Sequence, residues 1–208
     1  MYSKKKMVVA AVAATTLAAG LSVPASANTG TTSLATVLNV SAQAYDRNWN
    51  DFDILTAAIN TVLAAKPNSA VKVLADGNTE LTAFIPTDRA FRLLVLNMSG
   101  KVRSTEAGVA KDVVALGVDT VEAVLLYHVV LGAPILSPAA LASGGASLTT
   151  AQTGKFIVNV AGNSIELVDR DTAINNPRVI LTGVDINKGN KQVAHAIDRV
   201  LLPIKVSK

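Results

Sequence analysis

The chain has 208 residues, half of them hydrophobic, no cysteine and a formal net charge of +4. Three of its 19 basic residues are lysines within the first 27 positions, so the remainder carries 16 basic against 15 acidic residues, a net charge of +1, and no dense cluster of Lys and Arg. This near-neutral balance excludes nucleic acid as an expected partner, and the absence of disulfides leaves the hydrophobic core to hold the fold.

Residues 1–27 have the pattern of a secretory signal peptide. The basic run Lys4 to Lys6 is followed by an apolar stretch over 7–21, too short for a comfortable membrane span, and by an A-x-A cleavage signal that ends at Ala27. We therefore expect a secreted or extracellular monomer without a transmembrane anchor, with one domain over residues 28–208.

Helical signals dominate the first half of the chain. The clearest covers Asp51 to Ala64, where apolar residues return at helical spacing after a capping Asn or Asp. Asp119 and Glu122 resemble a capping box that would start another helix. Further helices are expected over residues 33–43, 90–94, 107–116 and 119–126, and short strands over 71–74 and 80–85.

Strand signals dominate the second half. Residues 155–160 and 165–168 predict a hairpin, and the nearly uncharged run Val193 to Leu202 predicts a strand covered on both faces. Shorter strands are expected at Tyr127 to Val130 and at 179–181, with a short helix at 139–142 after a proline. This segregation predicts an α+β fold class, with helices covering an antiparallel or mixed sheet.

A sharp corner is expected where the strand at 80–85 meets Pro86. The Thr87-Asp88 pair that follows can cap a helix, so the chain has to turn from strand to helix there. Phe84 before the corner and Phe91 after it are then expected in the core.

Three segments resemble the signatures of the fasciclin domain family. TAFIPTDRAF at Thr82 to Phe91 is similar to the first signature, LLYHVV at Leu125 to Val130 to the central segment, and VAHAIDRVLLP at Val193 to Pro203 to the second signature. They occur in the family's order. The residues that carry the resemblance are expected to be structural, namely Phe84, Pro86, Thr87, Asp88, Phe91, His195, Asp198 and Pro203.

The resemblance implies a wedge or sandwich of β-strands with helices packed around it, in exported or cell-surface proteins of adhesion and matrix interaction. In animal members, an Asp-Ile pair and a Tyr-His pair are associated with integrin contact. Asp185-Ile186 and Tyr127-His128 match those positions here and are the predicted partner-binding residues. Lys191, Gln192 and Ala194 depart from the family pattern, which weakens the transfer of a binding role.

Catalysis would have to use His128 or His195, the two histidines of the chain. Both lie in apolar segments, where hydrogen-bonded structural histidines are common. His195 and Asp198 are three residues apart, which on a strand places them on opposite faces and excludes a direct relay. Asp169 and Asp171 could hold Ca²⁺ weakly, but a solvated turn is the simpler interpretation because the spacing of a calcium loop is missing. We therefore predict no catalytic residue, cofactor or metal.

The predicted partner-binding residues have structural alternatives. On a strand, Tyr127 and His128 would face opposite ways, so at most one of them is expected at the surface. Asp185-Ile186 opens a polar loop, where Ile186 is either exposed for a partner or packed beneath the loop.

The main hypothesis is an exported, non-enzymatic adhesion or interaction module that binds an extracellular protein or a cell-envelope polysaccharide. The alternative is a carrier that holds a small hydrophobic ligand in a cleft between helices and sheet, as suggested by the high apolar content. A third hypothesis is a hydrolase that uses His195.

Overall fold

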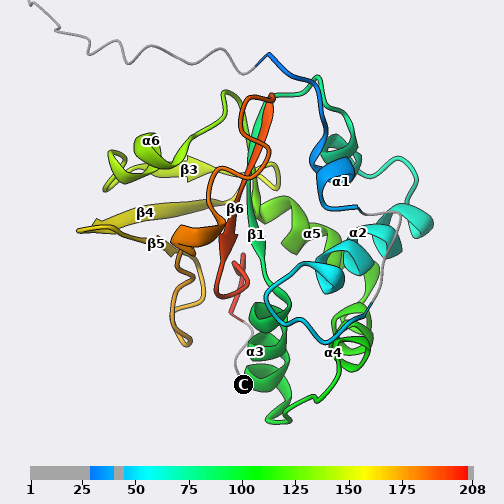
Figure 1. The fold of residues 1–208 in the computed structure, drawn as a ribbon. Coiled ribbons are helices and arrows are strands. Elements are labelled where there is room, and N and C mark those ends of the chain that lie inside the picture. The colour runs from blue at the N-terminus through cyan, green and yellow to red at the C-terminus, as the bar shows by residue number, and fades with distance from the viewer. Residues whose placement is uncertain (1–28, 40–44, 206–208) are drawn as a thin grey trace, which may run out of the picture.

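The computed structural model describes residues 29–39 and 45–205 (Figure 1). The predicted signal peptide, residues 1–27, lies outside the described residues, as does the end of the helix expected over 33–43. Among the described helices, none combines the length and apolar character needed to cross a bilayer.

The predicted α+β class is confirmed. The described part of the chain contains six α-helices and six strands. The strands form two small sheets, and the helices pack around them. The helices are α1 (Leu34–Val37), α2 (Asp53–Ala65), α3 (Asp88–Ser99), α4 (Glu106–Val114), α5 (Val118–Tyr127) and α6 (Ser137–Leu141), with 3₁₀ turns η1 (Ala70–Ala75) and η2 (Leu181–Gly183). The strands are β1 (Leu81–Pro86), β2 (Val129–Leu131), β3 (Ser147–Thr149), β4 (Lys155–Ala161), β5 (Ser164–Val168) and β6 (Gln192–Ile197).

The central mixed sheet brings the three sequence signatures together. Its order is β2-β1-β6, with β2 antiparallel and β6 parallel to β1. In this register Phe84 pairs with His195. All residues of β1 and β6 are buried, which confirms the prediction of a strand covered on both faces, although β6 ends at Ile197 rather than at Leu202.

The second sheet, β3-β4-β5, is antiparallel. The predicted hairpin is confirmed as β4 and β5, joined across Gly162, whose φ of 59° suits a glycine. Buried and exposed residues alternate along β4, so Phe156 and Val158 point inward while Ile157 faces outward. This alternation leaves one face of the sheet for solvent.

The central sheet separates two hydrophobic cores. Phe91 belongs to the core formed with α2 to α5, whereas Phe84 belongs to the core shared with the second sheet. Phe84 meets Phe156 edge-on at 5.4 Å between ring centroids, and Tyr127 packs on the same Phe156 ring at 6.2 Å. Figure 1 shows the β3-β4-β5 sheet on one side of β1 and β6, and α1, α2, α4 and α5 on the other.

Several local predictions were wrong. Residues 71–74 form part of η1 rather than a strand, because the Ser69 hydroxyl accepts from the amide of Val71 and starts a turn. Asp119 and Glu122 form no capping box, since both carboxylates bind the ammonium of Lys66 instead. Of the segment at 179–181, only Val179 pairs with another strand residue, through a bridge to Ile197.

Candidate functional site

The corner after β1 is held by the two residues expected to cap a helix. Thr87 Oγ1 accepts from the amide of Ala90 at 3.4 Å at the start of α3. Asp88 Oδ1 accepts from the amide of Ile54 at 2.9 Å, so it caps α2 rather than its own helix. Burial raises the pKa of Asp88 to about 8, and the neighbouring carboxylate of Asp51 adds to the shift.

His195 is a buried structural residue of β6. Its Nδ1 accepts from the amide of Asp185 at 3.3 Å, which leaves Nε2 to donate to the carbonyl of Ile135 at 2.7 Å. Burial lowers its pKa, and an Nδ1 that accepts from an amide belongs to a neutral ring. With both nitrogens bound to the main chain, His195 ties two loops to the strand and has no free base to offer a substrate.

His128 has the complementary arrangement. Its Nε2 accepts from the amide of Leu201 at 2.9 Å, and its Nδ1 therefore donates to the carbonyl of Val124 at 2.7 Å. Burial lowers the pKa from 6.5 to about 4. The ring joins the last turn of α5 to the segment after β6, which links the central and second signatures.

Tyr127 is fully buried and fixes the second sheet to α5. Its hydroxyl donates to the carbonyl of Lys155 at 2.7 Å, and burial raises its pKa to about 12. A Cβ atom at Gly154 would lie only 2.7 Å from the ring, so glycine is required for this contact. Tyr127 and His128 end a helix instead of forming a strand, and neither exposes its side chain. Their observed contacts are structural, and a partner-binding role for them stays a prediction.

Asp185 and Ile186 lie in the loop beside β6. Asp185 Oδ1 accepts from the amide of Ser137 at 2.7 Å and Oδ2 from its hydroxyl at 2.8 Å, so the carboxylate caps the start of α6. Ile186 pairs through its backbone with Ala194 and packs against the helical core. Of the two alternatives for Ile186, the structure shows the packed one. The partner-binding role of the pair stays a prediction.

The end of the second signature is fastened by two carboxylates. Asp198 Oδ1 accepts from the amide of Arg178 at 2.7 Å, and Asp169 Oδ2 accepts from that of Leu202 at 2.8 Å, just before Pro203. Burial raises the pKa of Asp169 to about 6. Asp169 also accepts from the amide of Asp171 at 2.9 Å, so the two residues form a turn, but Asp171 is buried and the predicted solvated turn is wrong.

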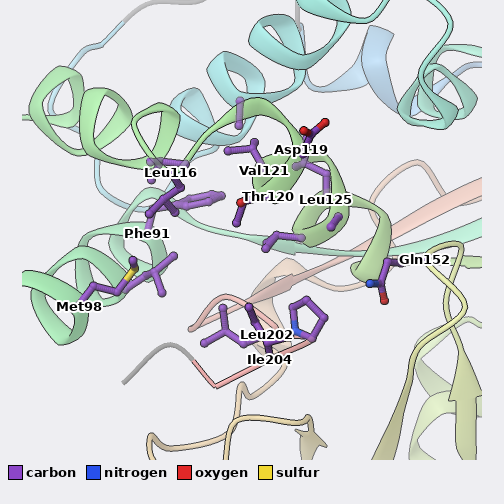
Figure 2. A pocket seen from close by; sticks show the side chains of 16 residues that line it. Phe91, Met98, Leu116, Asp119, Thr120, Val121, Leu125, Gln152, Leu202 and Ile204 are labelled. Carbon is purple, nitrogen blue, oxygen red and sulfur yellow. The ribbon is translucent and has the colours of Figure 1, made fainter. Parts of the chain in front are cut away.

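An apolar pocket of about 330 Å³ opens between helices and the segment after β6 (Figure 2). Phe91 and Met98 of α3, Val121 and Leu125 of α5, and Ile204 from the last described residues face it. Polar side chains reach it only at the rim, from Asp119, Thr120 and Gln152. The predicted cleft was placed between helices and sheet, whereas this pocket lies among helices and the C-terminal segment, which sequence patterns did not reveal.

Comparison with known proteins gives a family and a set of solved structures. A family model for the Fasciclin domain matches residues 55–203. No curated protein matches the chain. The chain is similar to the structure of a FAS1 domain pair from the insect cell adhesion molecule fasciclin I, with a TM-score of 0.49 and 14% identity over 70% of this chain and 45% of that one. The chain therefore spans less than half of that structure's length.

Proposed function

The chain belongs to the fasciclin domain family, whose members are generally non-enzymatic modules of adhesion and interaction, and from this premise we propose that it is an exported binding module. Its proposed partner is an extracellular protein or a cell-envelope polysaccharide. The pattern of residues 1–27 supports export.

The proposal of a non-enzymatic protein rests on the hydrogen bonds and the burial of the two histidines. A general base needs a free nitrogen within reach of a substrate proton. Both nitrogens of His128 and of His195 are engaged by main-chain groups, and both rings are buried. This arrangement supports architecture and disfavours the hydrolase hypothesis.

The loop over residues 181–190 is the proposed partner-binding surface. It contains Asp185 and Ile186, and it exposes Leu181, which is 51% accessible, and the side chain of Lys188. Because Asp185 caps α6 and the partly buried Ile186 packs against the core, the backbone of the loop is held in place at these two residues. A rigid surface loses little conformational entropy when it binds a partner.

A surface-binding assay tests the proposal. Protein purified from its own host, as that host processes it, is titrated over immobilised envelope polysaccharide and over purified extracellular proteins of the same host. We expect saturable binding to one of the two classes. Binding to neither would contradict the proposal.

A pair of matched variants assigns the surface. Leu181→Asp in the loop should weaken binding at least tenfold. Ile157→Asp, at a residue of β4 that is 47% exposed, should leave it unchanged. Equal loss in both variants would mean unspecific apolar adhesion, and no loss in Leu181→Asp would remove the loop as the binding surface.

The pocket in Figure 2 supports a second function, that of a carrier for a small hydrophobic ligand. Its volume of about 330 Å³ lies at the lower end of the range for ligand sites, and its lining is apolar with a few polar groups at the rim. Native mass spectrometry of protein from its own host should show an added mass. Ala123→Phe, which fills the pocket, should remove that mass, whereas Ala161→Phe on exposed β4 should not. A uniform ligand-free mass would contradict the carrier.

A further inference from the structure

Four of the described helices carry an acidic residue in their first turn, and three of these residues meet. They are Asp53 of α2, Asp88 of α3 and Glu106 of α4. One carboxylate oxygen of each lies within 4.8 Å of the others. A helix N-terminus favours one negative charge, but it does not explain why three helices bring their charges to one point.

A second acidic group adjoins the first. Asp46, Asp51 and Asp53 also place carboxylate oxygens within 4.8 Å of one another, and Asp53 belongs to both groups. Asp46 is exposed, Asp51 and Asp53 are half-buried, and Asp88 and Glu106 are buried. The five carboxylates therefore lead from the surface into the protein.

Four of the buried carboxylate oxygens in this cluster have no hydrogen-bond partner. They belong to Asp51, Asp53, Asp88 and Glu106. The side chains of Asp88 and Glu106 are only 0% and 1% exposed, and their other oxygens are engaged by the amides of Ile54 and Arg47. Asp88 and Asp51 can share a proton, but no donor among the described residues reaches the free oxygens of Asp53 and Glu106, and an unpaired buried carboxylate is strongly unfavourable.

Basic side chains do not compensate the cluster. Among residues 29–39 and 45–205, no lysine or arginine forms an ion pair with any of the five carboxylates, because the ion pairs present engage other acidic residues. Cationic side chains pair instead at the surface, as Lys66 does with Glu122 and Arg103 with Asp112. No basic side chain of the described residues therefore neutralises the cluster, and a bound cation would fill this role.

We propose that Asp46, Asp51, Asp53, Asp88 and Glu106 form a binding site for one calcium ion. Oxygens on opposite sides of Ca²⁺, at 2.3–2.6 Å from the ion, lie roughly 4.6–5.2 Å apart, which agrees with the spacing of 4.8 Å or less within each group of three. Five carboxylates suit the six to eight oxygen ligands of Ca²⁺ better than the compact, water-retaining shell of Mg²⁺. Zinc is disfavoured because the cluster contains no His or Cys.

The ion would join parts of the chain that are distant in sequence. Asp46 and Asp51 come from the loop before α2, and Asp88 belongs to the first signature, at the corner of β1 and α3. Calcium would therefore fasten that loop and the starts of three helices together. The site is separate from the 181–190 loop, so its test is independent of the proposed partner binding.

Calcium titration tests the site. Protein purified from its own host is stripped with a chelator, and calcium binding is followed by calorimetry and by thermal unfolding. We expect one ion per chain and a rise in Tm of about 5 °C or more once calcium exceeds its Kd a hundredfold. Absence of saturable binding at millimolar calcium, or an equal response to magnesium, would overturn the proposal.

Variants then locate the ion. Asp88 caps α2, so its replacement risks unfolding, and the test uses Asp53→Asn and Asp46→Asn, nearer the surface. Each should raise the Kd for calcium at least tenfold while the variant still unfolds cooperatively. Asp119→Asn, which removes an exposed carboxylate paired with Lys66, is the control and should bind calcium as the unmodified chain does. Unchanged calcium affinity in both cluster variants would overturn the site.

Discussion

Two regions of the molecule, the surroundings of the two histidines and the acidic cluster, treat their buried polar groups in opposite ways. Around His128 and His195, every ring nitrogen has a main-chain partner. Around Asp88 and Glu106, one oxygen of each carboxylate has none. A buried polar group is tolerated where hydrogen bonds within the protein replace those to water. A buried carboxylate oxygen without such a bond is stabilised by another partner, such as a cation. The comparison separates buried groups that hold the fold from buried groups that are suited to bind something.

The largest effect is expected from His128→Ala. The change leaves the amide of Leu201 and the carbonyl of Val124 without partners in the core and creates a cavity, so the free energy of unfolding should fall by about 4 kcal/mol. Denaturant unfolding measures it. His128→Asn, whose amide can still donate to Val124, should lose less, and a loss below about 1 kcal/mol in His128→Ala would contradict the structural role.

Acid should act through the same ring. Its pKa is about 4 in the folded protein against 6.5 unfolded, so the unfolded chain binds the extra proton first. The stabilisation is complete above about pH 6.5 and is lost as pH falls to 4, by about 3 kcal/mol. Burial shifts His195 in the same direction. The raised pKa values of Asp88 and Asp169 act in the opposite direction, so the check is the difference in unfolding free energy between the unmodified chain and His128→Asn from pH 7 to 4, which should shrink as pH falls.

Glu106→Gln should have the opposite sign. In chelator-treated protein, Gln removes an uncompensated buried charge, its oxygen can still accept from the amide of Arg47, and its NH₂ group can donate to a neighbouring carboxylate. We expect the free energy of unfolding to rise by about 1 kcal/mol. If Glu106→Gln in chelator lost as much unfolding free energy as His128→Ala, the carboxylate of Glu106 would already have hydrogen-bond partners. The contrast between the histidines and the acidic cluster would then fail.

Asp185→Ala should have a smaller effect. It removes the two hydrogen bonds to Ser137 that cap α6, a loss of about 1 kcal/mol in the free energy of unfolding. Asp185→Asn is the matched control, because Asn keeps an acceptor and tolerates the φ of 56° at this position. Equal losses in both variants would show that the charge, rather than the cap, stabilises the loop.

Much of the fold could be predicted from local patterns. The helix at 51–64, the hairpin of β4 and β5 and the buried β6 depend on periodicity and turn residues close in sequence. The strand predicted at Tyr127 and His128 was wrong because it relied on the β-propensity of these residues alone. The groups that bind them, the carbonyl of Lys155 and the amide of Leu201, are distant in sequence. Tertiary contacts overrode local preference there.

The candidate calcium site was missed for a similar reason. Its inner ligands, Asp88 and Glu106, lie far along the chain from Asp46, and only the folded chain brings them together. One local signal was available, since Asp46-x-Asn48-x-Asn50 resembles the opening positions of a calcium loop. The glycine and the terminal glutamate of such a loop are absent, so the pattern alone would not have been sufficient.

Lys66→Met should change the stability least, and it gives a baseline for the variants of the histidines and of the acidic cluster. Lys66 joins Asp119 and Glu122 near the surface, where water and salt screen the charges. Without Lys66, the exposed Asp119 stays solvated and Glu122 keeps the hydrogen bond from Ser69. The unfolding midpoint should change little, and the change should shrink further as salt is added. A loss comparable with that of His128→Ala would mean that exposed ion pairs hold this fold. Burial would then no longer distinguish the groups that matter, and the contrast between the histidines and the carboxylate cluster would lose its basis.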